Sequence, residues 1–470
     1  MPDNLGYATQ DEQQSETDVA TIVQQPGSFT RTGQIAGTSA TVSRDIVVSQ
    51  DEEDEEPDPP DLLNLNSFPD DPDFERAVRQ AEFAFDIGVD PVRIRQGSSG
   101  SYFIKNASDE IIAVFKPKSE EPYSSMNPKY GKWCQRVFCP CCFGRTCLLK
   151  NQGYLSEAGA SIVDEWLGLG IVPKTKIVWL ASEAFFYSKL TKAKCTAKRG
   201  IMATTPALGR RFKRLGVPLK VGSFQLFMRD YCGADEMLRR FSFETMPKKS
   251  MQNFQLLFEK LVILDYIVRN TDRGSDNWLI KVDVESHAQT SPSQNNDMQS
   301  SSNAVNSETA DGNWNVVNTP LISIAAIDNG LAFPFKHPDT WRAYPYQWAW
   351  LQPYAEIPFS KQTIANFLPL LRDLSNVENL VSELEALFSI DKNFNKTMFE
   401  KQMSIVRGQI MNLCEALSKK LSPSELVELP LRVVEKQSTA RDGNQITTEK
   451  DEDSEFRETY QEKRPFFTWC

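Results

Sequence analysis

The stretch Asn270-Thr-Asp-Arg-Gly-Ser-Asp-Asn277, which Ile327-Asp-Asn-Gly330 follows much later, decides the fold class of this chain. Asp272 and Asn277 stand five positions apart, the interval that separates the base from a metal ligand in the catalytic loops of kinases. Transfer of a γ-phosphoryl group requires a carboxylate that orients and deprotonates the attacking hydroxyl, and further oxygen ligands that hold Mg²⁺ against the phosphates. We therefore interpret Asp272 as the base, and Asn277 and Asp328 as metal ligands.

The residues before this stretch form a pattern typical of a buried helix. Residues 254–269 carry apolar side chains at helical spacing and then meet polar residues and a glycine, so the loop leaves a helix end. Asp, Asn and Gly also crowd many ordinary turns after helices. The order of the parts upstream favours the catalytic interpretation.

A glycine turn and a strand that ends in lysine precede the helix, in the order found in kinases. The turn at residues 97–101 would place backbone N–H groups over phosphates, because its small side chains allow close approach. Lys116, at the end of the strand 111–116, would neutralise the α- and β-phosphates. Each part alone also suits a hairpin turn or a solvated strand end. The predicted nucleotide contacts are Gly97, Ser98, Ser99, Gly100, Ser101, Phe103, Lys116 and Asp328.

Lys116 needs a carboxylate to hold it in place, and the predicted helix 155–167 offers Glu157 and Asp164. We favour Glu157, although an acidic residue on such a helix also suits a solvated face. The order of strands, helix and loops predicts an α+β, two-lobed protein-kinase-like fold, with a β-rich N-lobe and a mainly helical C-lobe.

Five strings of the sequence resemble the type II phosphatidylinositol 4-kinase family. They are residues 97–103, 113–118, 151–159, 269–278 and 325–333, within a similarity that spans about residues 75–435. The resemblance implies an ATP-dependent kinase that uses Mg²⁺ or Mn²⁺ and phosphorylates the 4-hydroxyl of phosphatidylinositol, giving phosphatidylinositol 4-phosphate. It also implies a peripheral, lipid-anchored protein on the cytosolic face of endosomal and trans-Golgi membranes, with the plasma membrane as a further candidate.

The resemblance gives roles to residues that the bare sequence leaves open. The short apolar segment 223–227 would be the hinge, in which the backbone of Gln225, Leu226 and Phe227 holds adenine. Glu121, Pro122 and Tyr123 would lie near the lipid substrate.

Charge is segregated along the chain. Residues 1–75 hold 18 Asp and Glu against 2 Lys and Arg, a net charge of −16, which leaves 50 basic and 45 acidic residues, or +5, in residues 76–470. We predict a disordered acidic arm at 1–75, a bilobal catalytic domain at 76–436 and a mostly disordered tail at 437–470. The polar stretch 284–314 would be a disordered loop between strands at 278–282 and 320–327.

A short motif in the arm predicts a partner. Asp58 precedes Leu62 and Leu63 at the offset of the acidic dileucine pattern, in which a charge accompanies two leucines that enter an apolar pocket. A clathrin adaptor is therefore the predicted partner of this segment, although such short patterns also arise by chance.

Five of the nine cysteines lie between residues 134 and 147. No signal peptide and no apolar run of membrane-spanning length is visible, which predicts a cytosolic compartment in which disulfides are not expected. Zinc is disfavoured because the two histidines of the chain, His287 and His337, are distant in sequence. Buried thiols and acylation remain as alternatives.

Acylation suits the neighbours of these cysteines better. Residues 129–150 contain five basic and no acidic residues, with aromatic side chains between them, so the segment can lie on an anionic bilayer. We predict a membrane-anchoring insert in which Cys139, Cys141 and Cys142 are palmitoylated. The cluster is similar to the family's Cys-Cys-Pro-Cys-Cys string, with Phe138 in place of its first cysteine.

Two further segments favour a membrane surface. Residues 189–220 hold ten Lys or Arg and no acidic residue. Residues 341–351 are rich in Trp and Tyr, which suits a membrane interface or an aromatic core under the activation segment. Nucleic acid is not expected as a partner, because aromatic stacking motifs are missing. The predicted membrane contacts are Lys129, Trp133, Trp341, Tyr344, Trp348 and Trp350.

Three functions share some of these features: a peripheral lipid kinase, a protein kinase and a catalytically idle membrane scaffold. The protein kinase is disfavoured because no His-Arg-Asp string and no Ala-Pro-Glu string accompanies the two motifs. The scaffold is disfavoured because Lys116, Asp272, Asn277 and Asp328 are all present. The peripheral lipid kinase is therefore the favoured function, and the family resemblance implies that its substrate is phosphatidylinositol in an anionic bilayer.

Overall fold

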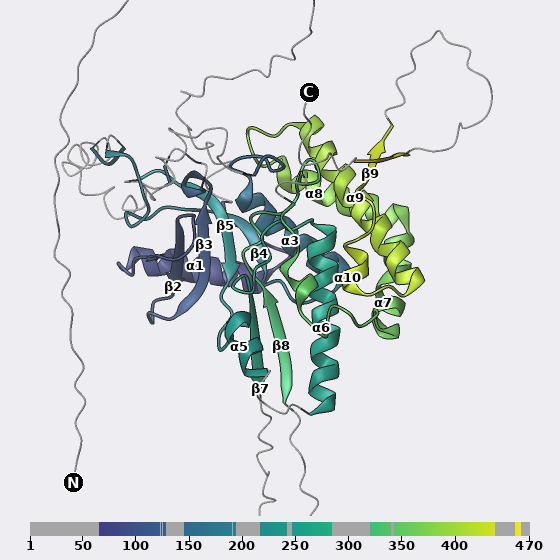
Figure 1. Cartoon of the computed structure of the whole chain (residues 1–470). Coiled ribbons are helices and arrows are strands. Elements are labelled where there is room, and N and C mark those ends of the chain that lie inside the picture. Colours follow the sequence, from purple (N-terminus) through teal and green to yellow (C-terminus); the bar gives the residue numbers. More distant parts are fainter. Residues whose placement is uncertain are drawn as a thin grey trace, which may run out of the picture. The chain divides into compact units, whose positions relative to one another are not determined.

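The computed structural model describes residues 65–122, 124, 126–127, 145–189, 191–193, 217–241, 247–283, 320–339, 343–437 and 456–461. All of them lie in the larger of the two units into which the chain divides, residues 53–470 (Figure 1).

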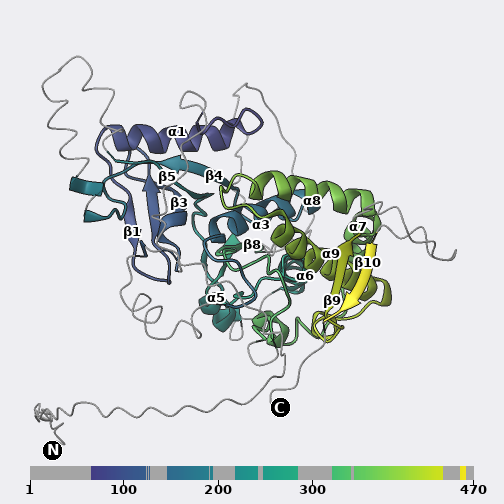
Figure 2. The ribbon, with the colours of Figure 1, turned by 90° about the horizontal axis from the view of Figure 1, so that it is seen from above.

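A five-stranded antiparallel sheet forms the N-lobe (Figure 2). The short 3-10 helix η1 (Lys118–Glu120) follows its central strand β3 directly. In β3 the side chains of Ala113 and Phe115 are fully buried while their neighbours are half-buried, the period-two pattern of a strand with one face on a core. The order across the sheet is β1 (Val92–Ile94), β2 (Ser101–Lys105), β3 (Ile111–Pro117), β5 (Lys220–Leu226) and β4 (Thr175–Leu180).

Helix α1 (Pro72–Asp86) covers one face of this sheet. It begins where the side chain of Asp71 accepts the N–H of Phe74. Phe74 and Val78 lie one helical turn apart and are fully buried. The ring of Phe74 packs edge-on against Phe224 of β5, with 5.6 Å between the centroids. Figure 2 shows α1 lying along the sheet.

Helix α3 (Gly153–Leu167) connects the two lobes. It packs on β4 and β5 on one side and on α8 (Leu374–Phe388) on the other. Leu155 and Val163 are fully buried, because the helix has protein on most of its surface. The helix ends at Gly168, whose φ of +63° is the left-handed conformation that favours glycine.

The C-lobe is built around α6 (Lys248–Ile267), which contains most of the helix predicted at residues 254–269. A three-stranded sheet lies beside it, in the order β6 (Cys232–Gly233), β7 (Trp278–Asp283) and β8 (Leu321–Ala326). β7 and β8 correspond to the two predicted strands and pair in antiparallel fashion, and the loop between them lies outside the described residues. The other helices are α5 (Ala234–Phe241), α7 (Lys361–Arg372), α8, α9 (Lys396–Lys419), α10 (Pro423–Leu426) and the 3-10 helix η5 (Gln347–Trp350). The predicted two-lobed α+β fold is confirmed.

Regular elements lie on the outer side of both predicted boundaries of the catalytic domain. Residues 65–75, which we assigned to the disordered arm, include a fully buried Phe74 and the first turn of α1. In the predicted tail, β10 (Phe456–Tyr460) pairs with β9 (Arg432–Lys436). Apolar Phe456 and Tyr460 are separated by charged residues, so the segment looks polar in composition although it forms a strand. The backbone hydrogen bonds to β9 form this strand although its apolar residues are sparse.

Two segments predicted to face a membrane lie partly inside the fold. Lys220, the last cation of the basic region 189–220, is fully buried and donates to Ser119 and Glu120 at 2.7 and 3.1 Å. In the cysteine-rich insert, Cys147 is buried, and its carbonyl accepts the N–H of Phe335 at 2.9 Å. The number of cations in a segment does not predict which of its residues are buried, because burial depends on tertiary packing. In the described part of the chain, no helix is long and apolar enough to span a membrane.

Candidate active site

Lys116, near the end of β3, is held by two carboxylates. Its Nζ contacts Oε1 of Glu157 on α3 and lies 3.0 Å from Oδ1 of Asp328. Burial alone would lower the pKa of Lys116, but the two carboxylates outweigh burial and raise that pKa, so the side chain is a fixed positive charge. Burial raises the pKa of Glu157. The favoured partner, Glu157, is thus the one in contact, whereas the carboxylate of Asp164 binds backbone N–H groups after α3.

The glycine turn connects β1 to β2 beside this lysine. Ser98 and Ser99 line the same cavity as Lys116. A Cβ at Gly100 would come within 2.4 Å of Oε2 of Glu120, and the N–H of Gly100 donates to the carbonyl of Glu120 at 2.9 Å. Only glycine therefore allows the turn to pack this closely on η1.

The turn after β8 brings Asp328 beside Asn277. The N–H of Ile327 donates to the carbonyl of Asn277 at 3.2 Å, so Asp328 is one residue away from Asn277 across the strand pair. Asp328 has a φ of +55°, a left-handed conformation that Asp tolerates. The ammonium of Lys116 lowers the pKa of Asp328 and keeps it ionised.

The donor atoms of this turn fit Mg²⁺. The side-chain nitrogen of Asn277 donates to the carbonyl of Asp272 at 2.7 Å, which leaves the side-chain oxygen as the ligand atom. One carboxylate and one amide oxygen are typical of Mg²⁺ sites at nucleotides, where phosphates and water supply the other ligands.

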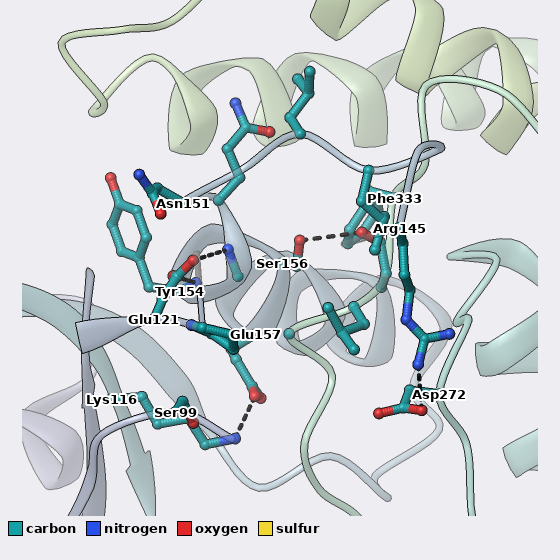
Figure 3. Close-up of a pocket in the computed structure, with 18 of the residues that line it drawn as sticks. Ser99, Lys116, Glu121, Arg145, Asn151, Tyr154, Ser156, Glu157, Asp272 and Phe333 are labelled. Carbon is teal, nitrogen blue, oxygen red and sulfur yellow. Dashed lines mark hydrogen bonds and ion pairs between the residues drawn. The ribbon is translucent and has the colours of Figure 1, made fainter. Parts of the chain in front are cut away.

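Asp272, the predicted base, is half exposed and paired with an arginine. Nη2 of Arg145 lies 2.5 Å from Oδ1 of Asp272, and Figure 3 shows this pair apart from the pair of Lys116 and Glu157. Burial raises the pKa of Asp272, and the guanidinium of Arg145 opposes this rise. The sequence placed Arg145 among the basic residues of the membrane insert, so this contact was not predicted.

Arg273 is a second residue of the site that sequence reasoning missed. It is 2% exposed and its Nε lies 3.0 Å from both carboxylate oxygens of Asp265. Its Nη1 donates to the carbonyls of Asn277 and Ile327, and its Nη2 donates to the side chain of Asn329. One guanidinium therefore joins the catalytic loop to the metal turn. Its position directly after Asp272 in the sequence was the one signal that pointed to a role in the site. Its hydrogen-bond partners could not be predicted, because some of them lie far away in the chain.

The base, the lysine and the metal turn surround one cavity of about 370 Å³ (Figure 3). Lys116, Glu157, Asp272 and Asp328 all line it, and Asn277 adjoins it through its bond to Asp272. The cavity thus brings together groups from β3, α3, the catalytic loop and the metal turn.

The predicted hinge lies at the end of β5. Gln225 is buried, and its side chain donates to Thr175 of β4 at 3.0 Å. The N–H groups of Leu226 and Phe227 donate to backbone carbonyls of Lys174 and Ile112, both at 3.0 Å. Phe103 and Phe227, two predicted nucleotide contacts, meet edge-on with 6.0 Å between their ring centroids.

Glu121 and Pro122, predicted near the lipid, line the cavity. The two oxygens of Glu121 accept the N–H groups of Gly153 and Tyr154 at 3.1 and 2.7 Å, so this carboxylate caps the N-terminus of α3. Burial raises the pKa of Glu121 to about 7. Tyr123 lies outside the described residues.

The predicted membrane contacts separate into three groups. Trp350 is 68% exposed and Tyr344 is half-buried under the guanidinium of Arg145. Trp348 is buried, and its Nε1 donates to Asp265 at 3.1 Å, so the prediction that it contacts a membrane is wrong. Here the alternative of an aromatic core applies, because Trp348 stacks on the buried ring of Tyr346.

The predicted residues outside the described part are Lys129, Trp133, Cys139, Cys141, Cys142 and Trp341, as well as the Asp58-Leu62-Leu63 motif.

This arrangement is that of the ATP-dependent phosphotransferases with a kinase-like fold, in which a lysine, a base and a metal turn converge on the nucleotide phosphates. Comparison with known proteins agrees with it.

The family described as "Phosphatidylinositol 3- and 4-kinase" matches residues 97–412. Phosphatidylinositol 4-kinase type 2-beta of Mus musculus is 51% identical over 403 residues, which cover 86% of this chain and 81% of that protein. Phosphatidylinositol 4-kinase type 2-alpha of Danio rerio is 50% identical over 404 residues, covering 86% of this chain and 84% of that protein. The chain belongs to the phosphatidylinositol 3- and 4-kinase family, and within it to the type 2 phosphatidylinositol 4-kinases.

Proposed function

We propose that this protein transfers the γ-phosphate of ATP to the 4-hydroxyl of phosphatidylinositol. The observation that carries the proposal is the cavity that Lys116, Asp272 and Asp328 line together. The identity of the acceptor, including the 4-position, is supported by the names of the relatives.

Four polar residues in or beside the cavity have chemical tasks in this reaction. Lys116 would neutralise the α- and β-phosphates. Asp328 and Asn277 would hold Mg²⁺ or Mn²⁺, which would supply positive charge to the phosphates. Asp272 takes the proton of the attacking hydroxyl. The new bond joins the inositol oxygen to the γ-phosphorus as the bond to the ADP oxygen breaks, so phosphatidylinositol 4-phosphate and ADP leave.

The adenine would lie between the hinge and β2. Because the N–H groups of Leu226 and Phe227 are already bonded to protein carbonyls, these residues offer carbonyls to the base, and any hinge N–H comes from the residues after Phe227. The edge-to-face pair of Phe103 and Phe227 supplies an apolar surface for the ring.

A membrane is the proposed site of action, since the substrate is a lipid. The exposed Trp350 and the cation-rich sequence from residue 129 support contact with an anionic bilayer. Palmitate on Cys139, Cys141 and Cys142 would add stable attachment, because one weak signal alone gives reversible binding. The proposed location is the cytosolic face of endosomal and trans-Golgi membranes, with a clathrin adaptor at Asp58, Leu62 and Leu63 as a sorting partner.

The test is a lipid kinase assay with a matched inactive variant. Purified protein is incubated with labelled ATP, Mg²⁺ and phosphatidylinositol vesicles, and the product isomer is identified by chromatography. We expect phosphatidylinositol 4-phosphate from the wild type, and a loss of at least about 10³-fold in kcat for Asp272→Ala with unchanged nucleotide binding. A different isomer, or full turnover by Asp272→Ala, would overturn the proposal.

A further inference from the structure

Arg145 is one of two cationic side chains among the described residues that line the cavity. The other is Lys116, which Glu157 and Asp328 hold by their carboxylates. Arg145 by contrast faces Asp272, and no second carboxylate is bonded to it in the described part of the chain. Lys116 is therefore held by two carboxylates, whereas Arg145 is paired with the single, half-exposed carboxylate of Asp272.

The backbone around Arg145 is anchored to the C-lobe. The N–H of Phe335 donates to the carbonyl of Cys147 at 2.9 Å, and the N–H of Leu148 donates to the carbonyl of Arg145 at 3.1 Å. The guanidinium carbon lies 4.1 Å from the ring centroid of Tyr344. Its side chain is 15% exposed. Arg145 is thus held in a defined position at the cavity wall, unlike a surface arginine.

The hydrogen bonds of the guanidinium leave donors for a ligand. Nη1 donates to the carbonyl of Thr271 at 2.5 Å, and Nη2 donates to Asp272 at the same distance. A guanidinium has five N–H groups in one plane, so these two bonds use fewer than half of them. Planar forks of this kind match the oxygens of a phosphate.

We propose that Arg145 is a phosphate-binding residue of this cavity, which orients Asp272 with part of its guanidinium and binds an anionic phosphate with the remainder. The proposal rests on the kinase activity proposed above. Both substrates of that reaction carry phosphate: the transferring γ-phosphoryl group of ATP and the phosphodiester of phosphatidylinositol. With either phosphate, Arg145 would contact both Asp272 and the phosphate group of a substrate.

The experiment compares Arg145→Ala and Arg145→Lys with the wild type, using ATP, the slower analogue ATPγS and phosphatidylinositol vesicles. Arg76→Ala is the matched control, because Arg76 forms an exposed ion pair with Asp73 on α1. We expect Arg145→Ala to lower kcat by about 10²–10³-fold, Arg145→Lys to recover part of this loss, and low concentrations of guanidinium to rescue the alanine variant.

Two measurements distinguish the γ-phosphoryl group of ATP from the phosphodiester of phosphatidylinositol as the group that Arg145 binds. If Arg145 binds the γ-phosphoryl group, the rate ratio of ATP to ATPγS changes in Arg145→Ala while the KM for phosphatidylinositol does not. If it binds the phosphodiester, the KM for phosphatidylinositol rises and the rate ratio is unchanged. A change confined to the melting temperature, or an alanine variant within about threefold of the wild type in both measurements, overturns the proposal.

A second readout separates this proposal from the proposed function. ATP hydrolysis without lipid is measured for the same variants, because it requires phosphoryl transfer to water and no phosphatidylinositol. A wild type that hydrolyses ATP but does not phosphorylate the lipid would refute the proposed acceptor. In that case the role of Arg145 at the γ-phosphate is still decided, since loss of hydrolysis in Arg145→Ala supports it and unchanged hydrolysis refutes it.

Discussion

Each lobe contains a fully buried ion pair next to a functional loop, and the two pairs are built differently. In the N-lobe Lys220 and Glu120 lie 3.1 Å apart, and both side chains are 0% exposed. In the C-lobe Arg273 and Asp265 lie 3.0 Å apart and are equally inaccessible. A buried pair is weak evidence for stability as such, so what matters is which other groups each pair connects.

The N-lobe pair makes its bonds around η1. Lys220 donates to Ser119, and Glu120 accepts the hydroxyl of Tyr102 at 2.7 Å and the N–H of Phe186 at 3.0 Å. These bonds hold η1, on which the turn at Gly100 packs.

The C-lobe pair makes bonds that join separate segments. Arg273 bonds to the carbonyls of Asn277 and Ile327, which belong to the catalytic loop and the metal turn. The lysine pair therefore supports the glycine turn, whereas the arginine pair sets the distance between catalytic groups.

Of the two ion pairs, the pair with Arg273 is expected to have the larger effect on catalysis. Arg273→Lys retains a charge against Asp265 but has no fork to reach Asn277 and Ile327, so the metal turn shifts relative to the base. Misplacement of about 1 Å is enough to reduce kcat by about 10²-fold. We expect that loss in the lipid kinase assay with a folded protein, whereas Arg273→Ala, which leaves Asp265 unpaired, destabilises by about 3–5 kcal/mol.

Arg407→Lys provides the control for this prediction. Arg407 is 4% exposed and contacts both oxygens of Glu378 at 2.6 and 3.1 Å, on helices away from the catalytic loop. Its replacement should lower the melting temperature and leave kcat unchanged. If Arg273→Lys and Arg407→Lys behave alike, the arginine of the catalytic loop only stabilises the fold.

An intermediate effect on catalysis is expected for Lys220. Lys220→Met leaves the carboxylate of Glu120 buried without its cation, which destabilises by about 3–5 kcal/mol. Because the N–H of Gly100 bonds to the carbonyl of Glu120, we expect a raised KM for ATP and a change in kcat smaller than that of Arg273→Lys. Thermal melting and steady-state kinetics at varied ATP measure both effects.

The double variant Lys220→Met with Glu120→Gln sharpens this prediction. It removes both charges and retains an oxygen that accepts the N–H of Phe186, so most of the lost stability should return. A double variant no more stable than Lys220→Met would show that the ion pair is not the cause of the loss.

Local residue patterns were sufficient to predict the functional segments and their order along the chain. The glycine turn, the strand ending at Lys116 and the two loops follow one another in the chain, and each has a characteristic residue pattern. Glu157 could also be predicted, because the predicted helix 155–167 contains few acidic residues that could hold Lys116.

Buried polar groups could not be predicted in the same way. Lys220 and Arg145 were assigned to basic membrane-facing segments, yet one is sealed in the N-lobe and the other contacts Asp272. Trp348 and Trp350 stand two positions apart, but only Trp350 is exposed. Charge and aromatic content are properties of a segment, whereas burial depends on partners that lie far away in the chain.

The smallest effect is expected for Trp348, whose indole N–H donates to Asp265 of the C-lobe ion pair. Trp348→Phe removes the indole N–H that Asp265 accepts at 3.1 Å, while Arg273 continues to neutralise the carboxylate. Loss of one such bond costs about 1–2 kcal/mol, so the melting temperature should fall by a few degrees with kcat nearly unchanged. Trp278→Phe is the control, since Trp278 is equally buried and stacks on Phe254. A larger loss of kcat in Trp348→Phe than in Trp278→Phe would mean that Asp265 itself, and not only Arg273, positions the catalytic loop.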